Sequence, residues 1–170
     1  IWENGLRDND VGNVGRVNEA PEILQHKGRT YMVYSANTCN GPNYKLGLME
    51  LTGENPLDLN DWVKNPEPVF ESANGVFGPG HNGFFTSPDG SENWLVYHGN
   101  ALVTEGCFST RSVRAQKIDF DASGFPIFGE PAAPGKLLVP PAGEASPQIV
   151  TPEGMSYRLA NQTLGYCVVN

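Results

Sequence analysis

A glutamate stands where a polar segment gives way to a predicted strand, in the stretch RVNEAPE at residues 16–22. Pro21 fixes its own φ angle and pushes Ala20 towards extended geometry, so Glu19 should be held at the strand entrance. A carboxyl group that is partly desolvated there keeps the proton that a general acid needs. A solvated loop residue is the alternative interpretation. Glu22 lies three residues further on, and alternation along a strand predicts that it faces the opposite side.

A second group of residues that could bind a ligand or an ion lies in the glycine-rich stretch GVFGPGHNGFF at residues 75–85. Its glycines allow close backbone approach, and His81 and Asn82 precede the next predicted strand. This position in the second part of the chain corresponds to that of Glu19 in the first. A histidine facing a central channel would contribute to an ion or ligand site. A hydrogen-bonded histidine in a glycine-rich loop is the alternative.

The third group is STRSVRAQ at residues 109–116, with two arginines three residues apart. On a strand they face opposite sides, so one of them should point inward. An inward arginine donates in-plane hydrogen bonds to adjacent hydroxyl groups, such as those of a sugar. We expect Arg111 to take this role and Arg114 to be a surface cation. His26 and His98 are expected to be structural.

The elements that must position these residues form two similar groups. Strands are predicted at 21–25, 29–35, 44–51 and 65–72, and then at 83–87, 93–99, 111–120 and 125–129. The two prolines of the 65–72 segment predict an edge strand. Two successive four-stranded units are more typical of β-propeller blades than of a sandwich. Two blades cannot close a ring, so the pattern predicts that further blades lie outside this sequence.

Composition limits the classes of partner. The chain has 170 residues, enough for one ordinary domain, and a net charge of −8 with a pI near 4.8. This charge argues against nucleic acid or an anionic membrane surface as a partner, because both reward clustered Lys and Arg. No apolar run approaches the roughly 20 residues that span a bilayer. The pattern favours a soluble protein that acts on a neutral ligand.

The sequence begins in a polar segment without Met and without a signal-peptide pattern, which we interpret as a processed end or a piece of a longer polypeptide. Cys39, Cys107 and Cys167 form no CxxC pair, so a zinc or redox motif is unsupported. Asn161 begins a pattern for N-glycosylation. Together these features favour a secreted protein, with one cysteine paired outside this chain.

We therefore divide the chain into three parts. Residues 1–18 are expected to be a loop that leads from a missing N-terminal part. Residues 19–131 are expected to form two blades, at about 19–72 and 75–131. Residues 132–170 are expected to be a Pro/Gly-rich tail packed on the propeller, with a last strand at GYCVV.

Several of these motifs occur in the order typical of one family. WENG, VNEAPEIL, GVFGPGHNGFF and TRSVRAQKIDFDASGFPIFGEP, from Trp2 to about Glu144, together resemble the C-terminal part of glycoside hydrolase family 43. Members of this family are five-bladed β-propeller enzymes that include arabinofuranosidases, β-xylosidases and arabinanases. The resemblance implies an all-β, five-bladed propeller to which this chain supplies about the last two blades and a tail.

The resemblance also implies roles for individual residues. Glu19 matches the general acid, and Ala20 stands where the family usually has glycine. His81 matches a histidine near a central water-coordinated calcium or other ion, and it would also lie at the substrate. Arg111 matches a substrate-binding arginine in the pocket, with Gln116 in register five residues later. The motif match is the basis for each of these roles.

The implied reaction is inverting glycoside hydrolysis, in which an aspartate activates water on the other face of the sugar. No aspartate here has a matching context, since Asp89 and Asp121 are expected in turns, so the base is expected on an N-terminal fragment held as a separate chain. The expected activity resembles that of an α-L-arabinofuranosidase on terminal pentoses of arabinan or arabinoxylan. A β-xylosidase, an endo-arabinanase, a non-catalytic sugar-binding propeller and a self-associating half-propeller remain alternatives.

Overall fold

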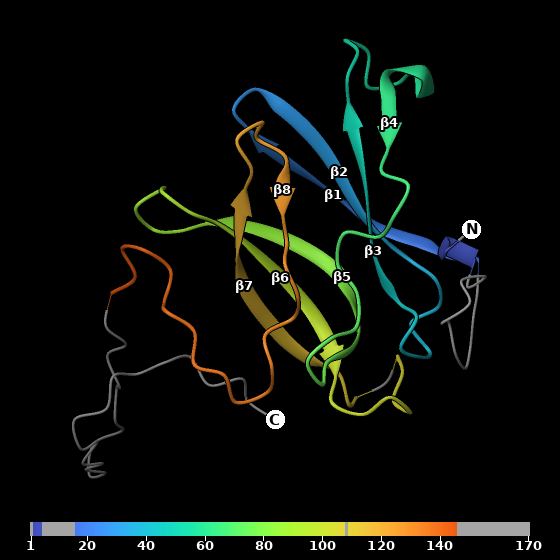
Figure 1. Ribbon diagram of the computed structural model, residues 1–170, viewed down its shortest axis with the longest axis vertical. Coiled ribbons are helices and arrows are strands. Elements are labelled where there is room, and N and C mark those ends of the chain that lie inside the picture. Colours follow the sequence, from blue (N-terminus) through green and yellow to red (C-terminus); the bar gives the residue numbers. More distant parts are fainter. Residues whose placement is uncertain (1, 5–15, 108, 146–170) are drawn as a thin grey trace.

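The chain forms two four-stranded antiparallel sheets, in a computed structural model that describes residues 2–4, 16–107 and 109–145 (Figure 1). The first sheet contains β1 (Asn18–His26), β2 (Arg29–Ala36), β3 (Lys45–Leu51) and β4 (Trp62–Lys64). The second contains β5 (Phe77–Thr86), β6 (Asn93–Asn100), β7 (Ser112–Phe120) and β8 (Pro126–Ile127). The helical elements of the described residues are two 3-10 turns, η1 (Trp2–Asn4) and η2 (Leu59–Asp61). The predicted all-β class is confirmed.

Each sheet is a meander, because every strand pairs with its neighbour in the chain. Short turns enforce this order. Lys27 and Gly28 both have positive φ, as in the type I′ turns whose twist suits a hairpin. In the second sheet, the Asp89 carboxylate accepts hydrogen bonds from Ser91, and Asp121 does the same for Ser123. The expectation that these two aspartates are turn residues is therefore confirmed.

The edge of the first sheet differs from the prediction. The fourth strand is Trp62–Lys64, not residues 65–72, and it pairs with Met49–Leu51 of β3. Pro66 and Pro68 lack backbone N–H groups and cannot continue a ladder. The following segment still touches β3 through an isolated bridge between Leu46 and Phe70. Because of the prolines, residues 65–72 run along the edge of the sheet without forming a regular strand.

The glycine-rich stretch also differs from the prediction, because it is not a loop that precedes a strand. Strand β5 begins at Phe77 and runs through the glycines. Its register with β6 shifts between Phe77 and Gly80 and again between Gly80 and Gly83. These irregularities bend the strand without ending it. β5 is also the strand of the second sheet that contacts β1, β2 and β3.

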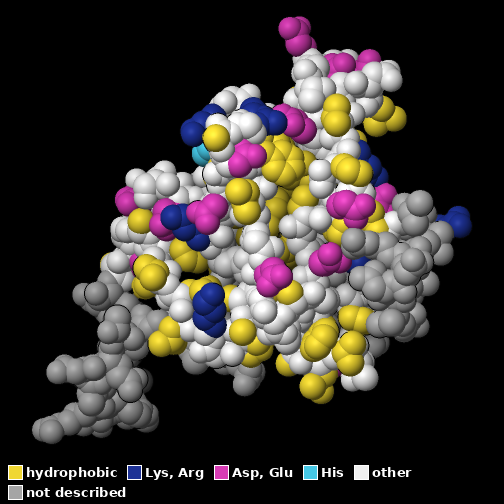
Figure 2. All heavy atoms as spheres, viewed as in Figure 1, with side chains coloured by type: hydrophobic (Ala, Val, Ile, Leu, Met, Phe, Trp, Pro, Cys, Tyr) yellow, Lys and Arg dark blue, Asp and Glu magenta, His cyan; other side chains and the backbone are white. Residues whose placement is uncertain are grey.

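One hydrophobic core lies between the two sheets. Its fully buried members come from both of them and include Tyr31 and Leu48 of the first sheet and Leu95 and Tyr97 of the second. The ring of Phe70 meets that of Tyr97 edge to face, with centroids 4.8 Å apart. The sheets therefore form a single packed unit. On the face shown in Figure 2, Asp and Glu side chains are spread among apolar ones, in accord with the net charge of −8.

A disulfide joins Cys39, in the connection between β2 and β3, to Cys107, in the connection between β6 and β7. It links the two sheets at one end of the molecule. The prediction that one cysteine pairs outside the chain could concern only Cys167, which lies outside the described residues, as do Asn161 and the GYCVV strand.

The described part of the C-terminal segment packs on the turn between β5 and β6. The Ala142 amide donates a hydrogen bond to Glu92, and the Ala142 carbonyl accepts one from Asp89. These contacts place residues near 142 against the second sheet.

The close approach at Gly78 leads to a stability prediction. Gly78 has a φ of +55°, and a Cβ there would lie 2.7 Å from the Gly41 carbonyl oxygen. Gly78→Ala should lower the free energy of unfolding by about 2–4 kcal/mol through backbone strain and overlap, measured by urea denaturation. Gly83→Ala on the same strand is the matched control, since nothing lies within 4 Å of its Cβ. Its effect should stay within about 1 kcal/mol. Equal stability of the two variants would contradict the assigned contact.

Candidate active site

Glu19 lies at a β-bulge near the start of β1. Glu19 pairs with Ser35 and Glu22 pairs with Val33, so β1 contains one residue more than β2 between these pairs. Ala20, within the bulge, has a φ of +51°, a conformation that glycine adopts more easily. Simple alternation between Glu19 and Glu22 therefore does not hold. The two differ in exposure instead, because Glu19 is half-buried and Glu22 is exposed.

The Glu19 carboxylate is held by a tyrosine that precedes β3. The Tyr44 hydroxyl donates a hydrogen bond of 2.6 Å to Glu19 Oε1, and the Tyr44 side chain is fully buried. Burial, followed by the hydrogen bond with Glu19, raises the pKa of Tyr44 well above its ordinary value. Tyr44 is therefore protonated near pH 7, and its hydroxyl can donate this hydrogen bond.

The space for the Tyr44 ring is provided by a glycine of β5. A Cβ at Gly80 would overlap the Tyr44 ring, so no larger residue fits there with the ring in place. The residue paired with Gly80 across the hairpin is His98 of β6. The imidazole of His98 lies parallel to the Tyr44 ring, with 5.6 Å between the centroids. The second sheet thus supports the residue that holds Glu19.

His98 in turn contacts the predicted pocket arginine. Nη1 of Arg111 lies 3.0 Å from Nε2 of His98. Burial, followed by the charges of Arg111 and the neighbouring His81, lowers the pKa of His98 to about 4. His98 is therefore neutral near pH 7, and its Nε2 can accept the hydrogen bond that Arg111 donates.

His81 is placed beside this group. Its φ is +53°, its side chain is exposed, and its backbone N–H donates a 2.7 Å hydrogen bond to Ser35 Oγ. The ring centroids of His81 and His98 are 5.9 Å apart. Across residues 2–4, 16–107 and 109–145, no group of three His, Cys, Asp or Glu side chains could hold a metal ion.

The prediction for Arg114 is wrong, whereas Arg111 lies on the side of the candidate site. Arg111 stands just before β7 and meets His98, as expected of a residue that faces the site. Arg114 is not a surface cation, because only 4% of it is exposed. Alternation along β7 puts it on the face of Gln116 and Ile118, which are also buried. Gln116 has a structural task, since its amide donates hydrogen bonds to the carbonyls of Phe128 and Glu130.

The sequence predictions thus identified three residues that the fold brings to one end of the two sheets, Glu19, His81 and Arg111. They missed Tyr44 and assigned His98 a structural role. The hairpin turn at residues 88–90 carried the signal for His98. The regular register of an antiparallel pair closed there brings residue 98 opposite residue 81, and the shift between Gly83 and Gly80 moves it to Gly80, next to His81. No comparable signal marks Tyr44, because its contact with Glu19 depends on how the strands pack.

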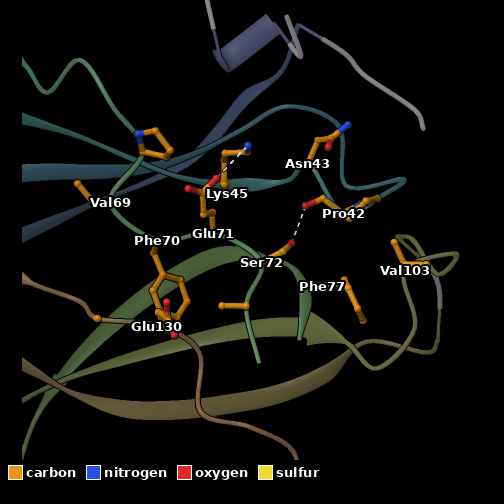
Figure 3. A pocket seen from close by; sticks show the side chains of 13 residues that line it. Pro42, Asn43, Lys45, Val69, Phe70, Glu71, Ser72, Phe77, Val103 and Glu130 are labelled. Atoms are coloured by element: carbon orange, nitrogen blue, oxygen red, sulfur yellow. Dashed lines mark hydrogen bonds and ion pairs between the residues drawn. The ribbon is translucent and has the colours of Figure 1, made fainter. Parts of the chain in front are cut away.

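A separate pocket of about 500 Å³ lies between the margins of the sheets (Figure 3). Lys45 and Glu71 point toward one another at its wall and form an ion pair of 3.2 Å. None of the described residues that line this pocket belongs to the group around Glu19, which consists of Glu19, Tyr44, His81, His98 and Arg111. Glu19 lines a smaller pocket of about 190 Å³ together with Tyr34, Met32 and Met49.

The contacts form one connected series from a carboxyl group, through a buried tyrosine and a neutral imidazole, to a guanidinium group. A half-buried carboxyl can donate a proton, and a guanidinium with nearby imidazoles can bind hydroxyl groups of a neutral ligand. The arrangement has the parts needed to bind a polyhydroxylated molecule and protonate one of its oxygen atoms.

Comparisons with known proteins agree with this chemistry. Glycosyl hydrolases family 43 matches residues 7–126. The chain is 37% identical over 131 residues to an extracellular exo-alpha-(1->5)-L-arabinofuranosidase of Streptomyces avermitilis, covering 71% of this chain and 26% of that protein. It is 36% identical over 135 residues to alpha-L-arabinofuranosidase 43 of Humicola insolens, covering 73% of this chain and 27% of that protein. The chain spans about a quarter of the length of these curated relatives.

The solved structures agree. An alpha-L-arabinofuranosidase from Lactobacillus brevis superposes with a TM-score of 0.64 at 33% identity, covering 69% of this chain and 38% of that one. The two sheets are blades of the five-bladed propeller found in these structures, as the sequence predicted. The family match covers most of the chain, and the matched residues 7–126 include Glu19, His81 and Arg111. The chain therefore belongs to glycosyl hydrolase family 43.

Proposed function

We propose that the complete protein is an α-L-arabinofuranosidase-like glycoside hydrolase in which Glu19 is the general acid. The observation that carries this proposal is the placement of Glu19 at the entrance of β1. There its carboxyl group is half-buried, bound through Oε1 to Tyr44, and joined through His98 to Arg111. A carboxyl group so placed is held in one orientation while it still faces an incoming ligand.

The proposed reaction inverts the anomeric carbon. Glu19 transfers its proton to the glycosidic oxygen as the bond from that oxygen to the anomeric carbon breaks. A second carboxylate removes a proton from water, whose oxygen attacks the opposite face of the sugar. In inverting enzymes the two carboxyl groups lie about 6.5–9.5 Å apart, which leaves room for this water.

The second carboxylate is assigned to another part of the propeller. Asp89 and Asp121 are engaged in the β5–β6 and β7–β8 turns, and neither contacts the Glu19 group. We assign the base to an aspartate on the N-terminal portion of the same protein, associated as a separate chain. This proposal accords with the quarter of the relatives' length that the chain spans.

The substrate class follows from the relatives and the site. The similar curated proteins are named arabinofuranosidases, and Arg111 can bind adjacent hydroxyls of a terminal pentose. Arabinan and arabinoxylan of plant cell walls carry such residues. A β-xylosidase or endo-arabinanase would use the same acid on another linkage. A non-catalytic carbohydrate-binding propeller is the candidate from another functional class. The neutral His98 and Arg111 could bind sugar hydroxyls in such a protein as well.

A central ion and an extracellular location belong to the same proposal. His81 would contact a calcium ion only through water, because calcium prefers oxygen ligands and the described residues supply no carboxylate cluster. The Cys39–Cys107 disulfide suits an oxidising compartment, and one relative is named extracellular. The described residues contain no helix long and apolar enough to cross a membrane.

Substitution of the acid distinguishes an enzyme from a binding module. Glu19→Gln in the complete propeller should lower kcat on an arabinofuranosyl disaccharide by about 10²–10⁴-fold, because the amide cannot donate the proton, while ligand affinity is retained. The matched control is Glu22→Gln, which changes an exposed carboxyl three residues away and should leave kcat within about twofold. Steady-state kinetics and calorimetric binding measure both. Unchanged turnover in Glu19→Gln would refute the acid role.

Substitution of the arginine tests substrate binding. Arg111→Met should raise KM by about tenfold or more, since hydrogen bonds from a charged donor to the sugar are lost. Lys117→Met is the control, because Lys117 is a cation of β7 that pairs with Glu92 at 3.1 Å, away from the candidate site. This substitution should leave KM unchanged. If both variants had the same KM as the parent protein, Arg111 would have no part in binding.

A further inference from the structure

We propose that Tyr44 is a positioning residue for the general acid: its hydroxyl fixes the orientation of the Glu19 carboxyl group and stabilises it as the proton leaves. The inference rests on the proposed function, because it assigns a task within the same reaction. Tyr44 stands directly before β3, and the family resemblance gave roles to Glu19, His81 and Arg111 but none to Tyr44.

The packing around the Tyr44 ring fixes the position of its hydroxyl group. Its ring is fully buried, lies in the space left by the missing side chain of Gly80, and is covered by the parallel ring of His98. A ring confined in this way cannot swing aside when the ligand enters or leaves. A buried tyrosine hydroxyl also needs hydrogen-bond partners. Here it donates to Glu19 Oε1 at 2.6 Å, and Ser35 is a second side-chain partner.

The hydrogen bond distinguishes the two carboxyl oxygens of Glu19. Among residues 16–107 and 109–145, Tyr44 is the side chain that donates to this carboxyl group, and it does so at Oε1. A proton on Oε1 would compete with the Tyr44 donor for that oxygen. The proton of the acid therefore resides on Oε2, the oxygen left to face the glycosidic bond.

The same hydrogen bond gains strength during the reaction. The Oε2–H bond breaks, the proton passes to the glycosidic oxygen, and that oxygen keeps the electron pair of its bond to the anomeric carbon. Glu19 is left as a carboxylate. A hydrogen bond to a carboxylate is roughly twice as strong as one between neutral groups, so Tyr44 stabilises the transition state more than the ground state.

The role predicts an effect that depends on the leaving group. Two substrates with the same arabinofuranosyl unit are compared in the complete propeller. One carries a 2,4-dinitrophenol leaving group, which departs without protonation, and the other is an arabinofuranosyl disaccharide, whose sugar alcohol needs the proton. Tyr44→Phe should lower kcat on the disaccharide by about tenfold or more. On the dinitrophenyl substrate it should lower kcat by less than about threefold, with KM unchanged for both.

A second tyrosine supplies the matched control. Tyr31 is also fully buried, on β2, and its hydroxyl donates a 2.8 Å hydrogen bond to the Gly124 carbonyl at the other end of the sheet. Tyr31→Phe removes the same atom and should change kcat on both substrates by the same small factor. Equal losses on the two substrates in Tyr44→Phe, or no loss on either, would overturn the positioning role.

Two further variants separate this inference from the proposed function and from a failure to fold. In the Glu19→Gln background, Tyr44→Phe should add no further loss on the disaccharide, because the group through which it acts is gone. Gly80→Ala displaces the ring while keeping the hydroxyl, and it should show the same selective loss as Tyr44→Phe. If Glu19→Gln lowered kcat equally on both substrates, the acid role of Glu19 would be rejected, and the role of Tyr44 that rests on it would be rejected as well.

Discussion

The contact between the Tyr44 ring and the backbone of Gly80 is the constraint on which the candidate site depends. It joins the first sheet to β5 at the end where Glu19 emerges. Because a side chain at residue 80 would occupy the space of the ring, the strand must carry a glycine there. The irregular register of β5 on either side of Gly80 lets the strand remain paired while it approaches so closely. The geometry of the candidate site and the geometry of the strand are therefore coupled.

The surroundings of this contact resist rearrangement. The Cys39–Cys107 disulfide ties the connection that leads to Tyr44 to the connection that leads to Arg111. His98 lies between these two residues and is kept neutral by its burial. A neutral imidazole accepts a hydrogen bond from a guanidinium group without charge repulsion. The candidate site thus combines one covalent link between the sheets with two hydrogen bonds and a ring contact that connect half-buried side chains through the buried Tyr44.

The position of Glu19 illustrates a compromise between strand regularity and function. The bulge at Ala20 requires a left-handed backbone, which costs an alanine more than it would cost a glycine. The extra residue, however, re-aims the side chain relative to a regular strand. A local cost in stability thereby sets the direction of the carboxyl group. The buried core between the two sheets, built around Tyr31, Leu95 and Tyr97, supplies the stability that this arrangement requires.

The sequence by itself determined the all-β class and the two four-stranded groups, because strand periodicity and turn residues are local signals. Family motifs, which are also local, predicted roles for three residues of the candidate site. Only the tertiary structure decided that residues 65–72 do not form the edge strand, that Arg114 is buried and that Tyr44 and His98 belong with Glu19. Pairing partners, bulges and burial depend on contacts between residues far apart in the chain. No stretch of sequence records that a tyrosine ring fits against a particular glycine.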